Sequence, residues 1–132
     1  MADVSFENRV AIVTGAGNGL GKAYALDLGK RGAKVVVNDL GGAVDGSGAG
    51  NTPADEVVNE IIANGGEAVA NYDSVATEEG GESIVQTAID SFGTVDAVIN
   101  NAGILRDKSF ANMTEEEFSL IIEVHLKGTY FV

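Results

Sequence analysis

A glycine-rich turn between an apolar block and a helical segment constrains the fold of this chain more than any other feature. The block occupies residues 10–13, the sequence TGAGNGLG follows at 14–21, and helical spacing of apolar residues continues to residue 30. A short continuous apolar run is typical of a strand buried on both faces. Because glycine tolerates tight turns and close backbone contacts, Gly15, Gly19 and Gly21 predict a compact strand–turn–helix unit.

Further strands and helices alternate along the rest of the chain. Apolar blocks predict strands at residues 35–37, 67–71 and 95–99. Capping residues predict helices that begin after Thr52, Thr77 and Thr114. This alternation predicts an α/β fold, a Rossmann-like doubly wound parallel sheet of four strands in the order 3-2-1-4 with four helices. A ligand crevice is expected at the carboxyl ends of strands 1 and 4.

Helical spacing also predicts which side chains pack against the sheet. In the first helix the apolar positions are Leu20, Ala23, Tyr24 and Leu28. In the last helix one face carries Phe118, Ile121, Ile122 and His125. Residues 41–50 contain five glycines and are predicted to form a flexible loop. Gly80 and Gly81 are expected to weaken the first turns of the helix after Thr77.

Composition excludes several classes of protein. The 20 acidic against 8 basic residues give a net charge of −12, which would repel a nucleic acid. No cysteine and a single histidine leave no cluster for a metal site. No apolar run approaches the roughly 20 residues of a membrane span, and the N-terminal sequence lacks a signal-peptide pattern. We therefore expect a soluble intracellular protein with no metal, nucleic-acid or membrane partner.

The glycine-rich turn and Asp39 together indicate a dinucleotide site. A helix N-terminus presents free amides and partial positive charge to a pyrophosphate. Asp39 lies 18 residues after Gly21, where a carboxylate can bind the adenine ribose and repel a 2′-phosphate. With Asn18 rather than a basic residue in the turn, NAD is expected over NADP. The alternatives are a plain tight turn and an ordinary strand-end carboxylate.

Two other strand ends carry candidate ligand residues. Asp73 and Ser74 follow the third strand, where they could receive the adenine amine, although both residue types also favour turns. The sequence NNAG follows the fourth strand at residues 100–103. Its small side chains would let the cofactor ribose approach the backbone, and the alternative is a simple Asn-Gly turn.

These motifs together resemble the N-terminal half of the short-chain dehydrogenase/reductase family. Within it, the stretches NDLGG, VANYDSV, NNAGILRDKSF and VHLKGTY resemble the (3R)-hydroxyacyl-CoA dehydrogenase unit of type 2 peroxisomal multifunctional enzymes. The resemblance implies NAD-dependent oxidation of (3R)-3-hydroxyacyl-CoA to 3-ketoacyl-CoA in fatty-acid β-oxidation. It also implies an acyl-CoA substrate, a homodimer and a peroxisomal location for the complete enzyme.

The resemblance assigns residues to each part of NAD. The pyrophosphate would lie against Gly15, Asn18, Gly19, Leu20 and Gly21, and Thr14 and Gly17 belong to the same cofactor-binding set. The adenine ribose would bind Asp39, the adenine would bind Asp73, Ser74 and Val75, and the nicotinamide-side ribose would bind Asn101, Ala102 and Gly103. His125 occupies the position of a family Asn that kinks the helix and holds a proton-relay water, and the alternative is a core histidine.

The family's catalytic Ser and its Tyr-x-x-x-Lys pair have no counterpart in this sequence. Tyr24 is followed four residues later by Leu28, and Tyr72 by Ala76, while Ser109 does not match the family Ser. We therefore interpret residues 1–132 as the N-terminal, NAD-binding part of a short-chain dehydrogenase domain whose C-terminal catalytic part is absent, and expect it to be inactive alone. The alternative is a non-catalytic module that binds NAD or pairs with a partner.

Two cations follow NNAG. Arg106 and Lys108 are the basic residues nearest to it on its C-terminal side. Because coenzyme A is polyanionic, they are candidates to flank a substrate entrance. The alternative is a solvated loop.

Overall fold

The computed structural model describes residues 4–41 and 52–132, so the loop predicted at 41–50 lies outside the described residues beyond Gly41. The strands are β1 (Val10–Thr14), β2 (Lys34–Asn38), β3 (Glu67–Asn71) and β4 (Ala97–Ile99). The helices are α1 (Gly19–Lys30), α2 (Pro53–Ala63), α3 (Glu78–Phe92), α4 (Glu115–Ile122) and α5 (Gly128–Phe131). A 3-10 turn (Phe110–Asn112) precedes α4, and a π-helical segment (Glu123–Lys127) joins α4 to α5.

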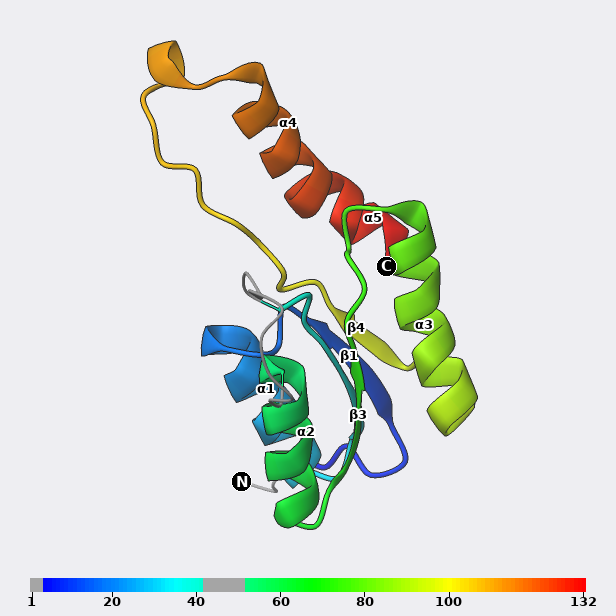
Figure 1. Ribbon diagram of the computed structural model, residues 1–132. Helices are drawn as coiled ribbons and strands as arrows, with labels where there is room; N and C mark the ends of the chain where they lie inside the picture. Colours follow the sequence, from blue (N-terminus) through cyan, green and yellow to red (C-terminus); the bar gives the residue numbers. More distant parts are fainter. Residues whose placement is uncertain (1–3, 42–51) are drawn as a thin grey trace.

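All four strands are parallel and lie in the order β3-β2-β1-β4, which confirms the predicted topology. Figure 1 shows α1 and α2 covering one face of the sheet and α3 covering the other. Each crossover therefore returns to the sheet as a βαβ unit. Among the described residues, no helix is long and apolar enough to cross a membrane.

The central strands are buried on both faces, as their apolar sequences predict. On the α1 and α2 side, Val13, Val35 and Val37 form one core cluster together with Val57 and Ile61 of α2. The opposite face of β1 and β2 contributes Val10, Ile12 and Val36, which pack with Ile84 and Ala88 of α3. Successive residues of one strand therefore serve different cores, and neither face of the central sheet is free.

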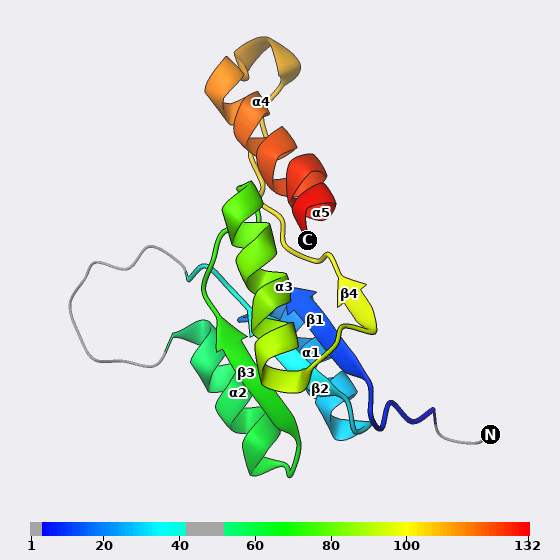
Figure 2. The ribbon, with the colours of Figure 1, turned by 90° about the vertical axis from the view of Figure 1, so that its right-hand side faces the viewer.

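Strand β4 is shorter than the predicted 95–99. The carboxylate of Asp96 accepts hydrogen bonds from the Val10 amide at 2.8 Å and from Arg9 Nη1 at 3.1 Å. The Asp96 amide donates to the Val10 carbonyl at 2.9 Å. Because a side chain takes the Val10 amide, the strand ladder begins only at Ala97, and β4 is the short strand at the edge of the sheet in Figure 2.

The apolar face predicted for α1 is wrong at Leu20 and Tyr24 and confirmed at Leu28, which packs against the core cluster. Leu20 is 68% exposed and Tyr24 is 41% exposed, whereas Gly21, Ala25 and Gly29 are buried. A Cβ atom added at Gly29 would lie 2.9 Å from Cγ2 of Ile61 on α2. The fully buried positions of α1 are small residues because the helix lies close to its neighbours there, and Leu26 and Leu28 pack beside them at partly buried positions.

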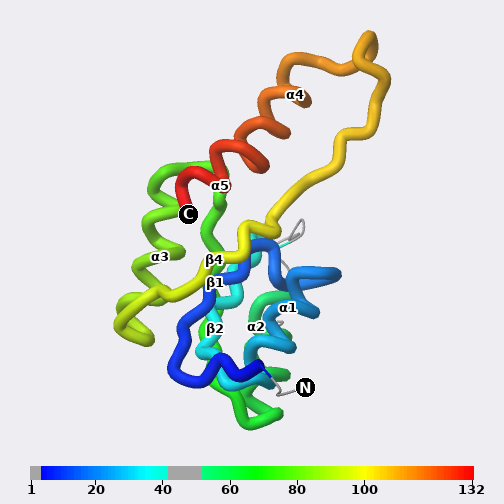
Figure 3. Tube along the Cα trace, turned by 180° about the vertical axis from the view of Figure 1, so that it is seen from behind, coloured from blue at the N-terminus to red at the C-terminus, as the bar shows by residue number. Residues whose placement is uncertain are grey.

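The last helical segment projects away from the sheet as an arm formed by α4, the π-helical segment and α5 (Figures 1 and 3). No residue of α4 is buried and Phe118 is 52% exposed, so the face predicted to pack from Phe118 onward is covered only in part, with Ile121 and Ile122 half-buried. The C-terminal end of the arm is the part that packs closely against the rest of the domain. A Cβ atom at Gly81 would lie 2.5 Å from the Phe131 carbonyl oxygen. Gly81 is therefore a docking point for α5, and not only a weak helix former.

The close approach of α1 and α2 can be tested with Gly29→Val. We expect it to lower the free energy of unfolding by about 1–3 kcal/mol, because the added methyl groups overpack the contact with Ile61. Ala23→Val is the matched control, because Ala23 is exposed on the same helix and should lose less than about 1 kcal/mol. Urea denaturation measures both variants. Equal losses would show that α1 tolerates bulk on its buried face.

Candidate functional site

A pocket of about 250 Å³ lies where the carboxyl ends of the strands meet. It brings together residues from the ends of all four strands, in agreement with the crevice expected for this sheet topology. The sequence-predicted residues that line it are Gly15, Asp39, Asp73, Ser74, Val75, Ala102 and Gly103. Their convergence from distant parts of the sequence defines the candidate site.

Glycine is required where the turn after β1 meets the turn after β4. Gly15 has a φ of +61°, and a Cβ atom there would lie 2.8 Å from the Cα of Ala102. A Cβ at Gly17 would lie 2.7 Å from Asp39 Oδ2. Gly19 differs, because its φ is +56° and the described chain places nothing within 4 Å of such a Cβ. Open space therefore adjoins the backbone at Gly19.

The N-terminus of α1 is open. Asn18 occupies its N-cap position but makes no capping hydrogen bond with its side chain, and the first turn contains no acidic residue. Asn18, Gly19 and Leu20 are all exposed. The first amides of a helix have no partners within the helix and carry partial positive charge. This end of α1 can therefore receive an anionic group.

Thr14 lies beneath the pocket and not in it. Its side chain is buried, with only 1% of the residue exposed. The Thr14 hydroxyl accepts hydrogen bonds from the amides of Asn101 at 3.1 Å and Ala102 at 3.0 Å, and donates to the Ile99 carbonyl at 3.4 Å. All of the hydrogen bonds of this hydroxyl join β1 to the end of β4, so the side chain supports the pocket from below, and the cofactor contact of Thr14 stays a prediction.

Asn101 completes this junction from the other side. Its Nδ2 donates to the carbonyl oxygens of Thr14 and Gly15, both at 3.0 Å. A Cβ atom at Gly21 would lie 2.5 Å from the same Nδ2. Asn101 thus fills the space between the turn and α1, and it is absent from the pocket lining.

Asp39 is held by two backbone amides. Its Oδ2 accepts from the Gly17 amide at 2.8 Å, and its Oδ1 accepts from the Gly41 amide at 2.9 Å. A carboxylate has about four acceptor positions, so both oxygens can accept further hydrogen bonds. The geometry fixes a negative charge at the pocket rim beside the glycine-rich turn.

A buried amide pair at the ends of β2 and β3 was missed by sequence reasoning. Asn38 and Asn71 are 2% and 5% exposed, and Asn38 Nδ2 donates to Asn71 Oδ1 at 2.9 Å. Asn38 Nδ2 also donates to the Asp73 carbonyl at 2.9 Å. The available signal was an Asn at the last position of each of these two apolar strands, where a buried polar side chain needs a partner.

The first turn of α2 is tied to the end of β3. Thr52 and Asp55 form a reciprocal capping box, as the sequence predicts. The Tyr72 hydroxyl donates to Asp55 Oδ1. This hydrogen bond lowers the pKa of Asp55 and raises the pKa of Tyr72. A Cβ at Gly17 would meet Pro53, so α2 also borders the glycine-rich turn.

His125 contacts the backbone beyond β4. It lies in the π-helical segment, and its Nε2 is 3.0 Å from the Ile104 amide nitrogen and 2.9 Å from the Ile104 carbonyl oxygen. A Cβ atom at Gly103 would lie 2.7 Å from His125 Cε1. The ring therefore packs against the segment that lines the pocket. It is exposed, which does not fit the core alternative.

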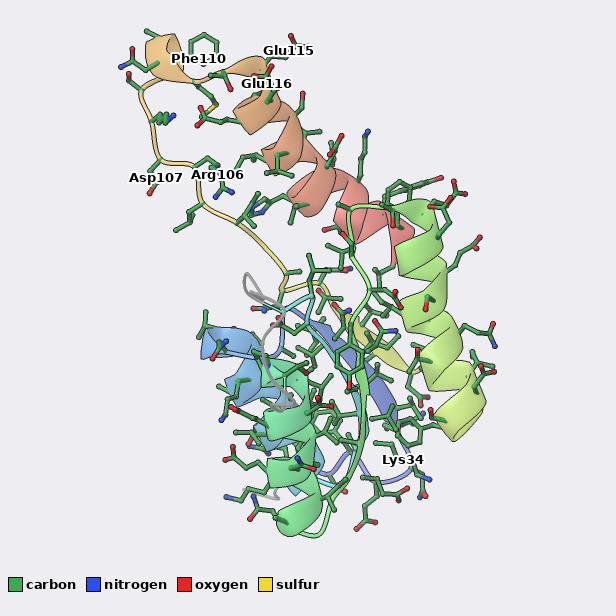
Figure 4. The ribbon with its side chains drawn as sticks, viewed as in Figure 1. Lys34, Arg106, Asp107, Phe110, Glu115 and Glu116 are labelled. Carbon is green, nitrogen blue, oxygen red and sulfur yellow. The ribbon has the colours of Figure 1, made fainter. Side chains whose placement is uncertain are left out.

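The two candidate cations differ in their surroundings. Lys108 Nζ hydrogen-bonds to Glu117 Oε1 at the start of α4, and this contact lowers the pKa of Glu117. Arg106 donates to the carbonyl of its neighbour Leu105 at 2.7 Å. Figure 4 shows Arg106 on the extended segment between the sheet and Phe110. Of these two cations, Lys108 forms a salt bridge among the described residues and Arg106 does not, although the charge of Arg106 also helps to lower the pKa of Glu117.

Comparisons with known proteins agree with this geometry. A family model described as short chain dehydrogenase matches residues 9–132. The chain is 62% identical over 127 residues to the peroxisomal multifunctional enzyme A of Dictyostelium discoideum, a match that covers 96% of this chain and 28% of that protein. It is 57% identical over 127 residues to the peroxisomal multifunctional enzyme type 2 of Mus musculus, covering 96% of this chain and 17% of that protein.

A solved structure shows the same fold. The crystal structure of a short chain dehydrogenase from Mycobacterium avium matches with a TM-score of 0.89 and 51% sequence identity. That match covers 95% of this chain and 43% of the other chain. The protein described here therefore spans less than half the length of each of these three relatives.

The junction at Thr14 can be tested with Thr14→Val, which keeps the shape of the side chain. We expect the free energy of unfolding to fall by about 2–4 kcal/mol, because two amides lose their acceptor. Thr94→Val is the control, because Thr94 is exposed in a loop. Thermal and urea denaturation compare the two. A Thr14 variant as stable as the control would show that the hydroxyl does not join the strands.

Proposed function

This chain belongs to the short-chain dehydrogenase family, and we propose on that premise that it is the NAD-binding part of a (3R)-3-hydroxyacyl-CoA dehydrogenase. The reaction would yield 3-ketoacyl-CoA during fatty-acid β-oxidation. The predicted resemblance to peroxisomal multifunctional enzymes is confirmed, since two such enzymes are 62% and 57% identical to it. The observation that carries the proposal is the open N-terminus of α1 beside the pocket.

The residues present fit a dinucleotide. The amides at the start of α1 would hold the pyrophosphate, because anions bind at uncapped helix N-termini. Gly19 leaves open space there that a side chain would fill. Ser74, Val75, Ala102 and Gly103 line the pocket, where the first two would face the adenine and the other two the nicotinamide-side ribose.

Asp39 supports NAD over NADP. Its carboxylate is fixed at the rim by the amides of Gly17 and Gly41, so it cannot turn away from a bound ribose without breaking both contacts. It can accept hydrogen bonds from ribose hydroxyls. A 2′-phosphate at the same place would meet a fixed negative charge.

When bound, NAD would supply the acceptor for the hydride that leaves the substrate. The chain's own contribution would be to bind and orient it. His125 would hold the Ile104 backbone in place through Nε2, and this would position the pocket wall formed by Gly103. Because no tyrosine in this sequence has a lysine four residues later, we propose that the chain binds NAD without transferring hydride by itself.

The substrate, assembly and location belong to the same proposal. Acyl-CoA would be the substrate of the complete enzyme. By its resemblance to the multifunctional enzymes, the complete enzyme would be a homodimer located in the peroxisome. Arg106 is the better candidate for a contact with the anionic coenzyme A, because Lys108 already has Glu117 as its partner. The support for the location is the peroxisomal naming of the relatives.

The pyrophosphate position can be tested with Gly19→Ala. The variant should lose about 1–2 kcal/mol of stability because φ is positive there, and its Kd for NAD should rise by about tenfold or more because the new methyl group occupies the ligand's space. Gly93→Ala is the matched control. Gly93 has a φ of +84°, open space around it and a place at the end of α3.

Titration calorimetry with NAD measures both affinities, and urea denaturation measures both stabilities. The expected result is a similar loss of stability with a loss of NAD affinity only in Gly19→Ala. Unchanged NAD affinity in that variant would place the pyrophosphate elsewhere.

The coenzyme preference can be tested with Asp39→Asn. We expect the unsubstituted chain to bind NAD at least about tenfold more tightly than NADP, and the variant to bind both with similar affinity because the repelling charge is gone. Asp90→Asn on the exposed side of α3 is the control. Calorimetric titration with each dinucleotide gives the ratio. If the Asp39→Asn variant keeps the same preference for NAD over NADP, Asp39 does not determine the coenzyme preference.

A further inference from the structure

We propose that Ser83 and Asn71 are positioning residues that fix the carboxylate of Asp73, so that the pocket selects adenine over hypoxanthine in the bound dinucleotide. This inference rests on the proposed function, because it concerns the base of the same ligand. Asp73 lines the pocket, whereas Asn71 and Ser83 do not. Their effect on the ligand would therefore pass through Asp73.

The two oxygens of Asp73 have different surroundings. Oδ2 accepts a hydrogen bond from Ser83 Oγ at 2.6 Å and another from Asn71 Nδ2 at 3.1 Å. Among the described residues, Oδ1 has no hydrogen-bond donor. One oxygen is thus anchored to α3 and β3, and the other remains available as an acceptor at the pocket.

Asn71 is itself held in one orientation. Its Oδ1 accepts from Asn38 Nδ2 at 2.9 Å and from the Asp73 amide at 3.0 Å. Its Nδ2 donates to Thr87 Oγ1 at 2.9 Å as well as to Asp73. The Thr87 hydroxyl donates to the Ser83 carbonyl at 2.8 Å, so it can only accept from Asn71. A flipped amide would lose these contacts, and the donor to Asp73 is therefore fixed.

The chemistry of the two bases explains the selection. Adenine presents an amino group, a donor, where hypoxanthine presents a carbonyl oxygen, an acceptor. An ionised carboxylate only accepts hydrogen bonds, so a fixed Oδ1 would bind the amino group and repel the carbonyl. A carboxylate that could rotate would reach the neighbouring N1–H of hypoxanthine instead. The two donors on Oδ2 prevent this rotation, and Ser83 supplies the shorter of the two contacts.

The test compares NAD with nicotinamide hypoxanthine dinucleotide by calorimetric titration of the full 132-residue chain. We expect the Kd of the hypoxanthine analogue to exceed that of NAD by about tenfold or more, since it leaves a charged acceptor facing a carbonyl. In Ser83→Ala the ratio should fall to about threefold or less. Asp73→Asn should bring it to about one, because the amide can donate as well as accept.

Two variants serve as controls. Ser83→Thr keeps the hydroxyl and should keep the discrimination. Ser91→Ala removes an exposed hydroxyl from the same helix and should leave both affinities unchanged. The ratio of the two Kd values is the decisive readout, because a general loss of stability would weaken the binding of both dinucleotides to a similar extent. Urea midpoints confirm that each variant is folded.

The outcomes separate this inference from the proposed function. If NAD binds and Ser83→Ala retains the full discrimination, the positioning role is overturned while the proposed function stands. The same holds if the unsubstituted chain binds both dinucleotides equally. If neither dinucleotide binds, the proposed function fails, and this inference fails with it.

Discussion

The contact between the turn after β1 and the turn after β4 governs the rest of the structure. Ala102 lies where a side chain at Gly15 would have to be, and the buried Thr14 hydroxyl joins the two turns through amides that would otherwise be unpaired. Buried amides without acceptors are costly, so the two strands must end at the same level. The ligand pocket lies just outside that junction because the sheet order reverses direction there.

The carboxylates of the candidate site already accept hydrogen bonds from groups within the protein. Asp39 binds the amides of Gly17 and Gly41, and Asp73 binds Asn71 and Ser83. These contacts hold two negative charges in place before any ligand arrives, which reduces the ordering that binding would require. A role in binding and a role in folding are therefore properties of the same side chains, and sequence motifs alone cannot separate the two.

Strands and helix starts could be predicted from the sequence, because they depend on local features. Apolar blocks mark the strands, and Thr52 and Thr114 form the capping boxes expected of them. The packing face of α1 could not be predicted in the same way. Helical periodicity identifies large apolar residues, but the contact with Ile61 requires Gly29. That requirement comes from the distance between two helices, which no local pattern records.

The candidate site also divides into residues that local sequence patterns predict and residues whose role depends on contacts between distant segments. The glycine-rich turn and Asp39 could be predicted because their spacing reports one continuous strand–turn–helix–strand unit that ends at Asn38. The Asn38 and Asn71 pair was missed because its meaning depends on β2 and β3 being neighbours with matching ends, in the register that pairs these two residues. His125 adds a further case. Its π-helical segment alters the angular spacing of side chains, so a face extrapolated from Phe118 by α-helical spacing does not describe how the histidine reaches Ile104.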